Sequence, residues 1–260
     1  MSQSKRDELA DAVKSVPARR DDLLKPLGER PAPSGNTRAD TSARLAQASE
    51  HVTPYAATRI QRHVDNYADL MTEAGVKPEL ATELAAHATD TLLAQEMEGM
   101  ERQLGDHGIA HIGGNIDRAL KILDVVPGTD TAADKLQVMV ANIYHDTGYM
   151  TGPARNFLDE GHPRWSEQHY EAEIKPLVAK ALGVQAASEI QHSIRTHADT
   201  SINWQEDAVG SAVRVADNTG LIQRDKLPPL FRHIPANIET LSRLSRKEIS
   251  LPDAQEQMRQ

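Results

Sequence analysis

A histidine and an aspartate, His145 and Asp146, stand side by side at the end of an apolar segment. Residues 136–143 are rich in Leu, Val, Met and Ile, and Gly148 follows the pair closely. We therefore expect the pair at the C-terminal end of a buried helix, where an imidazole and a carboxylate can both reach one metal ion. Seven of the eleven histidines lie from His107 to His197, each in a segment expected to be a helix or a helix end.

A second histidine pair lies upstream. His107 and His111 are four residues apart, so both would lie on one face of a helix that continues to about residue 126. Such a pair can form half of a metal site, but the glutamate that follows the first histidine in zinc proteases is missing. Two polar residues near a helix start would be the simpler interpretation if this were the only cluster.

Further histidines and one aspartate complete the candidate set. The helix expected from about residue 166 carries His169, and the helix expected over residues 186–198 carries both His192 and His197. Asp217 follows the mostly apolar residues 208–216. A carboxylate in an apolar helix is costly unless a positive group pairs with it, and a metal ion would satisfy this carboxylate.

Helices are the elements expected to position these side chains. Aromatic residues make up 3% of the chain, and Ala, Leu, Glu, Asp and Arg are abundant, which favours helix over sheet. Thr53 and Pro54 are typical of a helix start, and apolar residues then recur at three- and four-residue spacing. Gly75 is expected to end that helix and Pro78 to begin the next. We predict an all-α fold.

The chain divides into four expected parts. Residues 1–50 contain several prolines and few large apolar residues, so we expect a flexible arm there. Residues 51–105 are expected to form an N-terminal helical extension, and residues 106–225 carry the candidate site. Residues 226–260 are expected to form a C-terminal helical tail that packs on the bundle or makes a dimer contact.

Composition limits the classes of function. At 260 residues the chain can bury a substantial core, and without cysteine any metal must be bound by nitrogen and oxygen ligands. The net charge of −9 argues against general nucleic-acid binding. The sequence shows neither a long apolar run nor a signal-like N-terminus, so we expect a soluble, cytoplasmic protein that does not associate with a membrane.

The order of these residues resembles the HD-domain superfamily of metal-dependent phosphohydrolases. Its signature is a histidine, a His-Asp pair about thirty residues later and a distal aspartate, each on a different helix of an all-helical bundle. The segments 107–112, 145–149 and 213–218 are similar to its successive motifs, and the resemblance covers about residues 106–222. It implies an HD-domain helical bundle, here with extra N-terminal helices and a C-terminal helical tail.

The resemblance also implies a metal site. The residues that match the family's ligand positions are His111, His145, Asp146, His169, His197 and Asp217. His169 and His197 match the two extra histidines of the subset that binds two metals, with His192 as the alternative to His197. If both extra positions are ligands, Asp146 would bridge the two ions.

Departures from the family's motifs narrow the choice of family branch and of phosphate-binding residues. The Gly-Tyr-Pro motif of the cyclic-di-GMP phosphodiesterase branch and the acidic pair of the ppGpp hydrolases are both missing. Tyr149 replaces the lysine that is common after the His-Asp motif. Phosphate contacts are therefore sought among the basic residues near the motifs, which are Arg118, Lys121, Arg155, Arg164, Arg195 and Arg214.

The expected function is hydrolysis of a phosphomonoester or phosphodiester, with a nucleotide as the expected small-molecule substrate. One or two divalent ions (Mn, Fe, Co, Ni or Zn) would activate water, with Asp146 at the catalytic centre. His107, His162 and His192 are the candidates for protonating the leaving group. A mixed-valent di-iron oxygenase of the same superfamily and a non-catalytic regulatory or interaction module remain alternatives, and a homodimer is possible.

Overall fold

A computed structural model describes residues 20–102, 108–151, 161–199 and 201–220, together with residues 250 and 253. Within these ranges the regular elements are all helices, which confirms the predicted all-α class. The expected tail over residues 226–260 lies outside the described ranges, apart from residues 250 and 253. Among the described residues, every helix is either too short or too polar to span a lipid bilayer.

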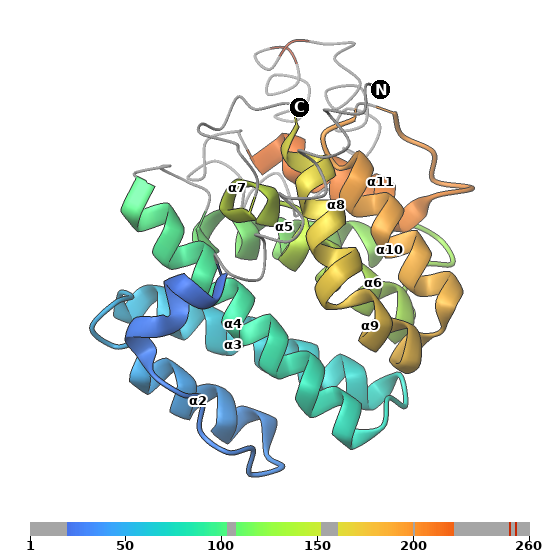
Figure 1. Cartoon of the computed structure of the whole chain (residues 1–260). Coiled ribbons are helices and arrows are strands. Elements are labelled where there is room, and N and C mark those ends of the chain that lie inside the picture. Colours follow the sequence, from blue (N-terminus) through green and yellow to red (C-terminus); the bar gives the residue numbers. More distant parts are fainter. Residues whose placement is uncertain are drawn as a thin grey trace, which may run out of the picture.

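The helices follow one another along the chain, and Figure 1 labels the α-helices. In chain order the elements are the 3₁₀ helix η1 (Lys25–Leu27) and the α-helices α2 (Thr37–Gln47), α3 (Pro54–Glu73), α4 (Pro78–Arg102), α5 (Ile109–Leu123), α6 (Ala132–Tyr144), α7 (Thr147–Thr151), α8 (His162–Glu173), α9 (Lys175–Leu182), α10 (Val184–Thr196) and α11 (Ala208–Gly220).

The start of α3 follows the predicted helix-capping chemistry. The side chain of Thr53 accepts a hydrogen bond from the backbone N–H of Ala56, and Pro54 occupies the first turn, where no N–H donor is needed. Gly75 follows the helix with φ +73°, a conformation that glycine adopts without strain. Pro78 then begins α4, so both predicted boundaries are confirmed.

Helix α6 lies at the centre of the molecule. Its residues from Leu136 to Tyr144 are all buried, and it contacts α3, α4, α5, α8, α10 and α11. Figure 1 shows α2, α3 and α4 on one side of the bundle and the later helices on the other. One continuous apolar core joins the two sides. The helices before residue 105 are therefore part of the same packed unit as the helices that carry the candidate site.

The segment that follows residue 20 is folded, in contrast to the flexible arm expected over residues 1–50. Leu24, Leu27 and Leu45 are buried in the common core. The side chain of Asn36 caps α2 by accepting a hydrogen bond from the N–H of Ala39, at 3.2 Å. The prolines prevent one long helix here, but they do not prevent short helices whose apolar residues reach the core. Residues 1–19 lie outside the described ranges.

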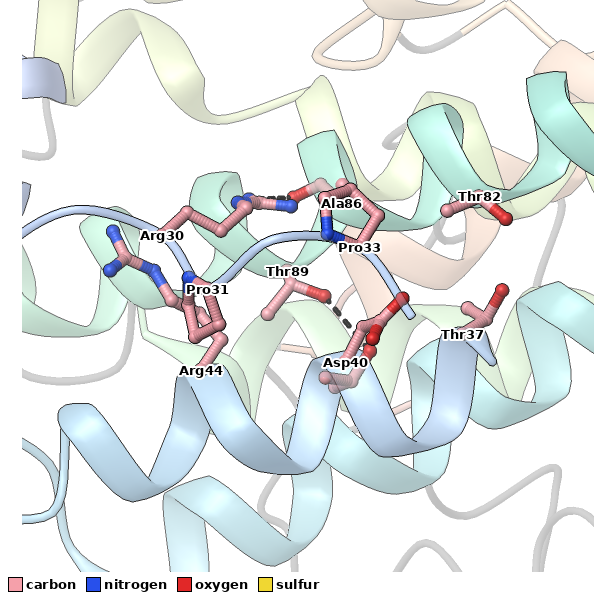
Figure 2. Close-up of a pocket in the computed structure, with 10 residues that line it drawn as sticks. Arg30, Pro31, Pro33, Thr37, Asp40, Arg44, Thr82, Ala86 and Thr89 are labelled. Atoms are coloured by element: carbon pink, nitrogen blue, oxygen red, sulfur yellow. Dashed lines mark hydrogen bonds between the residues drawn. The ribbon is translucent and has the colours of Figure 1, made fainter. Parts of the chain in front are cut away.

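Two arginines attach this segment to α4. The guanidinium of Arg44 lies 3.0 Å from one carboxylate oxygen of Asp90, and Arg30 lies 2.5 Å from the other. Arg30 also donates to the carbonyl oxygen of Ala86. Figure 2 shows these arginines at a pocket between residues 30–33, α2 and α4. No candidate site residue lines this pocket, and we assign it to packing of the N-terminal segment.

Helices α3 and α5 approach each other closely at Gly113. A Cβ atom added to Gly113 would lie 2.5 Å from Nε2 of His63, which is itself buried. At the neighbouring Gly114, a Cβ atom would lie 3.1 Å from Nη1 at the end of the Arg118 side chain, so a shift of a few tenths of an ångström would relieve the contact. The contact between α3 and α5 therefore requires glycine at position 113, whereas position 114 can accept a Cβ atom.

We expect Gly113→Ala to lower the free energy of unfolding by about 1–3 kcal/mol, because the new methyl group forces α3 and α5 apart. Gly114→Ala is the matched control. It should change stability by less than about 1 kcal/mol, since the better helix propensity of alanine offsets a small shift of Arg118. Denaturant unfolding of both variants measures the difference, and equal stabilities would contradict the close approach.

Candidate metal centre

Two histidines of the site are positioned by the same local geometry. His145 directly follows α6 and His197 directly follows α10, so each ring lies at a helix C-terminus. The Nδ1 atom of His145 lies 2.7 Å from the carbonyl oxygen of Asn142, and Nδ1 of His197 lies 2.8 Å from that of Ile194. Because a carbonyl oxygen only accepts, Nδ1 carries the proton in each neutral ring. The Nε2 lone pairs are then directed into the site, as metal ligation requires.

A first group of donors comes from α5, the end of α6 and α11. Nε2 of His111 and Nε2 of His145 lie 3.2 Å and 3.1 Å from the same oxygen of Asp146, Oδ2. The two nitrogens are 3.3 Å apart. Oδ1 of Asp217 lies 3.1 Å from Nε2 of His111 and 3.4 Å from Nε2 of His145. Four donor atoms on three different helical regions therefore converge on one point.

A second group of donors uses the other oxygen of Asp146. Oδ1 of Asp146 lies 3.4 Å from Nε2 of His162 and 3.6 Å from Nε2 of His197. The two histidine nitrogens are 2.8 Å apart. Asp146 thus lies between the two groups, with one carboxylate oxygen directed at each.

Burial makes these contacts electrostatically strong. The side chains of His145 and His197 are fully buried, whereas those of His162 and Asp217 are 12% and 19% exposed. Burial by itself would lower the pKa of His145, but the charge of Asp146 and hydrogen bonds to it and to Asp217 outweigh burial and raise that pKa well above its ordinary value. His111 is shifted in the same direction by the same two aspartates.

The carboxylate of Asp217 shifts in the opposite direction. Burial would raise its pKa, but hydrogen bonds with His111 and His145 outweigh burial and hold the pKa well below its ordinary value. The first group of donors therefore favours an ionised Asp217 beside a concentrated positive charge. Protons on His111 and His145, whose pKa values are raised, provide that charge in the absence of a cation, and a divalent ion can take their place.

The donor set fits a metal ion. His111, His145 and Asp146 form one group of possible ligands, and Asp146, His162 and His197 form another. Donor atoms that share an ion at about 2.0–2.2 Å lie roughly 3 Å from one another, which is the spacing seen in both groups. Imidazole and carboxylate donors suit several divalent transition ions, so the set does not select one of them. These residues could hold a metal ion.

The structure brings together five of the six residues proposed as ligands and adds His162 to them. Of the proposed six, His111, His145, Asp146, His197 and Asp217 lie in the cluster. His162, which was expected to contact substrate or donate a proton, occupies the second group. Its ring stacks on Tyr149 at 4.3 Å between centroids with an interplanar angle of 15°, which fixes its orientation.

His169 lies elsewhere, in contrast to its expected role as a ligand. Its side chain is fully buried, and neither ring nitrogen has a hydrogen-bond partner among the described residues. The ring packs edge-on against Tyr144. Burial, together with the nearby positive groups Arg20 and His87, lowers the pKa of His169 to about 3, so the ring is neutral. His169 therefore belongs to the packed core and lies outside both groups of possible ligands.

The other proposed residues differ in their relation to the cluster. His192 is exposed on α10 and is outside both ligand groups. Arg195 pairs with Glu167, and Arg214 pairs with Asp207. The two basic residues of α5 differ in burial. Lys121 is exposed, whereas Arg118 is buried beside the site. Arg164 is half-buried in the first turn of α8, two residues after His162. His107 and Arg155 lie outside the described residues.

Asn115 is a site residue that the sequence analysis did not identify. It lies one turn after His111 on α5, and its side chain is fully buried. Its Nδ2 atom lies 2.8 Å from Oδ1 of Asp217. In the sequence, Asn115 is a polar residue on the apolar helix face that Ile112, Ile116 and Ala119 define, and this pattern could have identified it.

Comparison of the chain with protein-family models, with curated proteins and with solved structures found no match.

We expect Gly148→Ala to weaken the second ligand group selectively. The N–H of Gly148 donates to Oγ of Ser166 at 2.8 Å, and a Cβ atom at this position would overlap the carbonyl oxygen of His162. The methyl group should therefore displace the start of α8 together with the His162 ring. Metal analysis should show one fewer ion per chain than in the wild type. Gly99→Ala, which makes only ordinary van der Waals contact, is the control.

His169→Leu should reduce the pH dependence of stability and leave metal content unchanged. In the unfolded chain His169 takes up a proton below its ordinary pKa of 6.5, whereas in the folded chain it stays neutral down to about 3. The wild type therefore loses stability as the pH falls through this window, by roughly 2 kcal/mol from this residue between pH 8 and pH 5. Denaturant unfolding at both pH values measures the loss, and an identical slope in the variant would contradict the assignment.

Proposed function

We propose that this protein is a metal-dependent phosphohydrolase of the HD type. The observation that carries the proposal is the placement of Asp146, whose two carboxylate oxygens face two separate pairs of histidines. Asp146 would thus help to hold an ion in each group, and a pair of divalent ions would supply positive charge that stabilises a phosphoryl group during hydrolysis. The order of the ligands along the chain supports the resemblance to the HD-domain superfamily.

The protein residues would bind and orient the reactants. Divalent ions supply hydroxide from water near neutral pH and offset the negative charge of a phosphoryl group. The substrate would enter beside His162 and Asp217, which are the more exposed members of the cluster. Arg164 is the described arginine nearest in sequence to that opening, and we propose it as a phosphate contact. Arg118 is buried behind Asp217 and would position the site instead.

The proton for the leaving group would come from a residue outside the ligand groups. His162 would be occupied as a ligand, and His192 is exposed on α10. Of the three histidines considered for this role, His107 is the one that remains a candidate, and it lies outside the described residues. The proposed substrate class is a phosphomonoester or phosphodiester, with nucleotides as the first compounds to screen.

Metal content is the first test. We expect about two transition-metal ions per chain in protein purified without chelator, and none in His145→Ala/Asp146→Ala. His162→Ala and His197→Ala should each lose one ion. Each should lower Mn²⁺-supported hydrolysis of bis(p-nitrophenyl) phosphate and of nucleotides by more than the roughly 10- to 100-fold that loss of an outer-shell partner costs. His192→Ala changes an exposed histidine of the same helix as a control and should retain both metal and activity.

Three results would contradict the proposal. Absence of metal after reconstitution with Mn²⁺, Fe²⁺ or Zn²⁺ would favour an interaction module. Two iron ions accompanied by dioxygen uptake, without phosphate release, would favour the oxygenase alternative. Equal metal loss in His192→Ala and His162→Ala would show that the second ligand group is misassigned.

A further inference from the structure

The amide of Asn115 lies directly against the first ligand group. Its Nδ2 atom is 2.8 Å from Oδ1 of Asp217, 3.0 Å from Nε2 of His111 and 3.4 Å from Nε2 of His145. An amide N–H₂ group donates and has no lone pair for a metal. In this orientation Asn115 therefore acts on the ligands and does not itself ligate.

Arg118 determines which way the amide faces. Its guanidinium donates to Oδ1 of Asn115, and its Nε donates to the carbonyl oxygen of Ala216 at 3.0 Å. Arginine has no acceptor, so a flipped amide would place its N–H₂ group against the guanidinium donors. The carbonyl of Ala216 precedes Asp217 in the chain, so Arg118 also ties the backbone of α11 to α5 beside the ligand.

Asp217 is the member of the first ligand group that most needs this support. Its side chain is 19% exposed, whereas that of His145 is fully buried. A carboxylate at the edge of a site can rotate away or accept hydrogen bonds from water. A buried donor that holds Oδ1 in place removes that freedom before a metal binds.

We infer that Asn115 is a positioning residue of the metal centre, held by Arg118, that fixes the carboxylate of Asp217 toward His111 and His145. The inference rests on the proposed metal centre and deepens it. Partners of this kind contribute about 10- to 100-fold to metal affinity. The effect is specific to the first ligand group, because Asn115 contacts none of the donors contributed by His162 and His197 in the described contacts.

Titration with Co²⁺ alone tests this role without relying on enzymatic activity. The full-length chain is stripped with chelator and titrated against a competing chromogenic chelator, with the visible absorption of bound Co²⁺ recorded. Asn115→Ala should weaken one of the two Co²⁺ ions by 10- to 100-fold and leave the other unchanged. Asn218→Ala is the matched control, since Asn218 lies beside Asp217 on α11 but donates to the backbone oxygen of Arg214.

Arg118→Met distinguishes two roles of the Asn115 amide: a hydrogen-bond donor to the ligands, or a direct metal ligand through Oδ1. The variant keeps an apolar stem and removes both donors, so the amide is free to rotate. If Asn115 acts as a donor held by Arg118, the same Co²⁺ ion should weaken as in Asn115→Ala. Thermal unfolding of the metal-free variants shows whether any loss reflects a damaged fold, because unfolding would affect both ions equally.

The other outcomes of the titration would overturn either the role of Asn115 or the metal centre itself. Unchanged affinity in Asn115→Ala, or equal weakening of both ions, would overturn the positioning role. Tighter binding in Arg118→Met would also overturn it and assign Oδ1 of Asn115 as a direct ligand. If the wild type binds no Co²⁺, the proposed metal centre itself fails, whereas normal wild-type binding with unaffected variants removes only the inference about Asn115.

Discussion

The carboxylate of Asp146 is the interaction on which the site depends. A buried carboxylate costs several kcal/mol unless positive groups or hydrogen bonds compensate it. Here the compensation comes from four histidines on different parts of the chain, two for each oxygen. No local segment could provide them, so the helices that carry these histidines must meet at one place. The arrangement of the bundle around α6 is the consequence of that requirement together with apolar burial.

Helix ends contribute to the same electrostatic pattern. His145 and His197 each lie at a helix C-terminus, where unsatisfied carbonyl groups give a partial negative charge. In both cases a carbonyl oxygen of the last helical turn accepts a hydrogen bond from Nδ1 of the ring. The two helices therefore favour positive charge at the cluster and fix the tautomer of His145 and His197 through the same contact. This repeated geometry explains why a histidine directly after an apolar helix was an informative signal in the sequence.

The sequence predicts the helices and much of the site, because both depend on local features. The boundaries of α3 and α4 follow from Thr53, Gly75 and Pro78, and the His-Asp pair follows from its place after an apolar helix. The roles of His162 and His169 could not be assigned in this way. The sequence predicts a helix from about residue 166 that carries His169 and leaves His162 before it, whereas α8 begins at His162. What distinguishes them is contact with α7, where Gly148 allows a close approach and Tyr149 stacks on His162. The folding of residues 20–50 was missed for a similar reason, since the ion pairs of Asp90 join positions far apart in the chain.

The burial of α6 from Leu136 to Tyr144 also has a kinetic consequence. The backbone amides of this stretch are surrounded by six other helices, so we expect their exchange with solvent deuterium to require a large opening of the bundle. His145 and Asp146 directly follow this buried stretch. His162, by contrast, begins α8 and is held there by packing against the short helix α7. The two halves of the cluster thus belong to regions of different local stability. An ion held mainly by α5, α6 and α11 should dissociate more slowly than one that depends on α8.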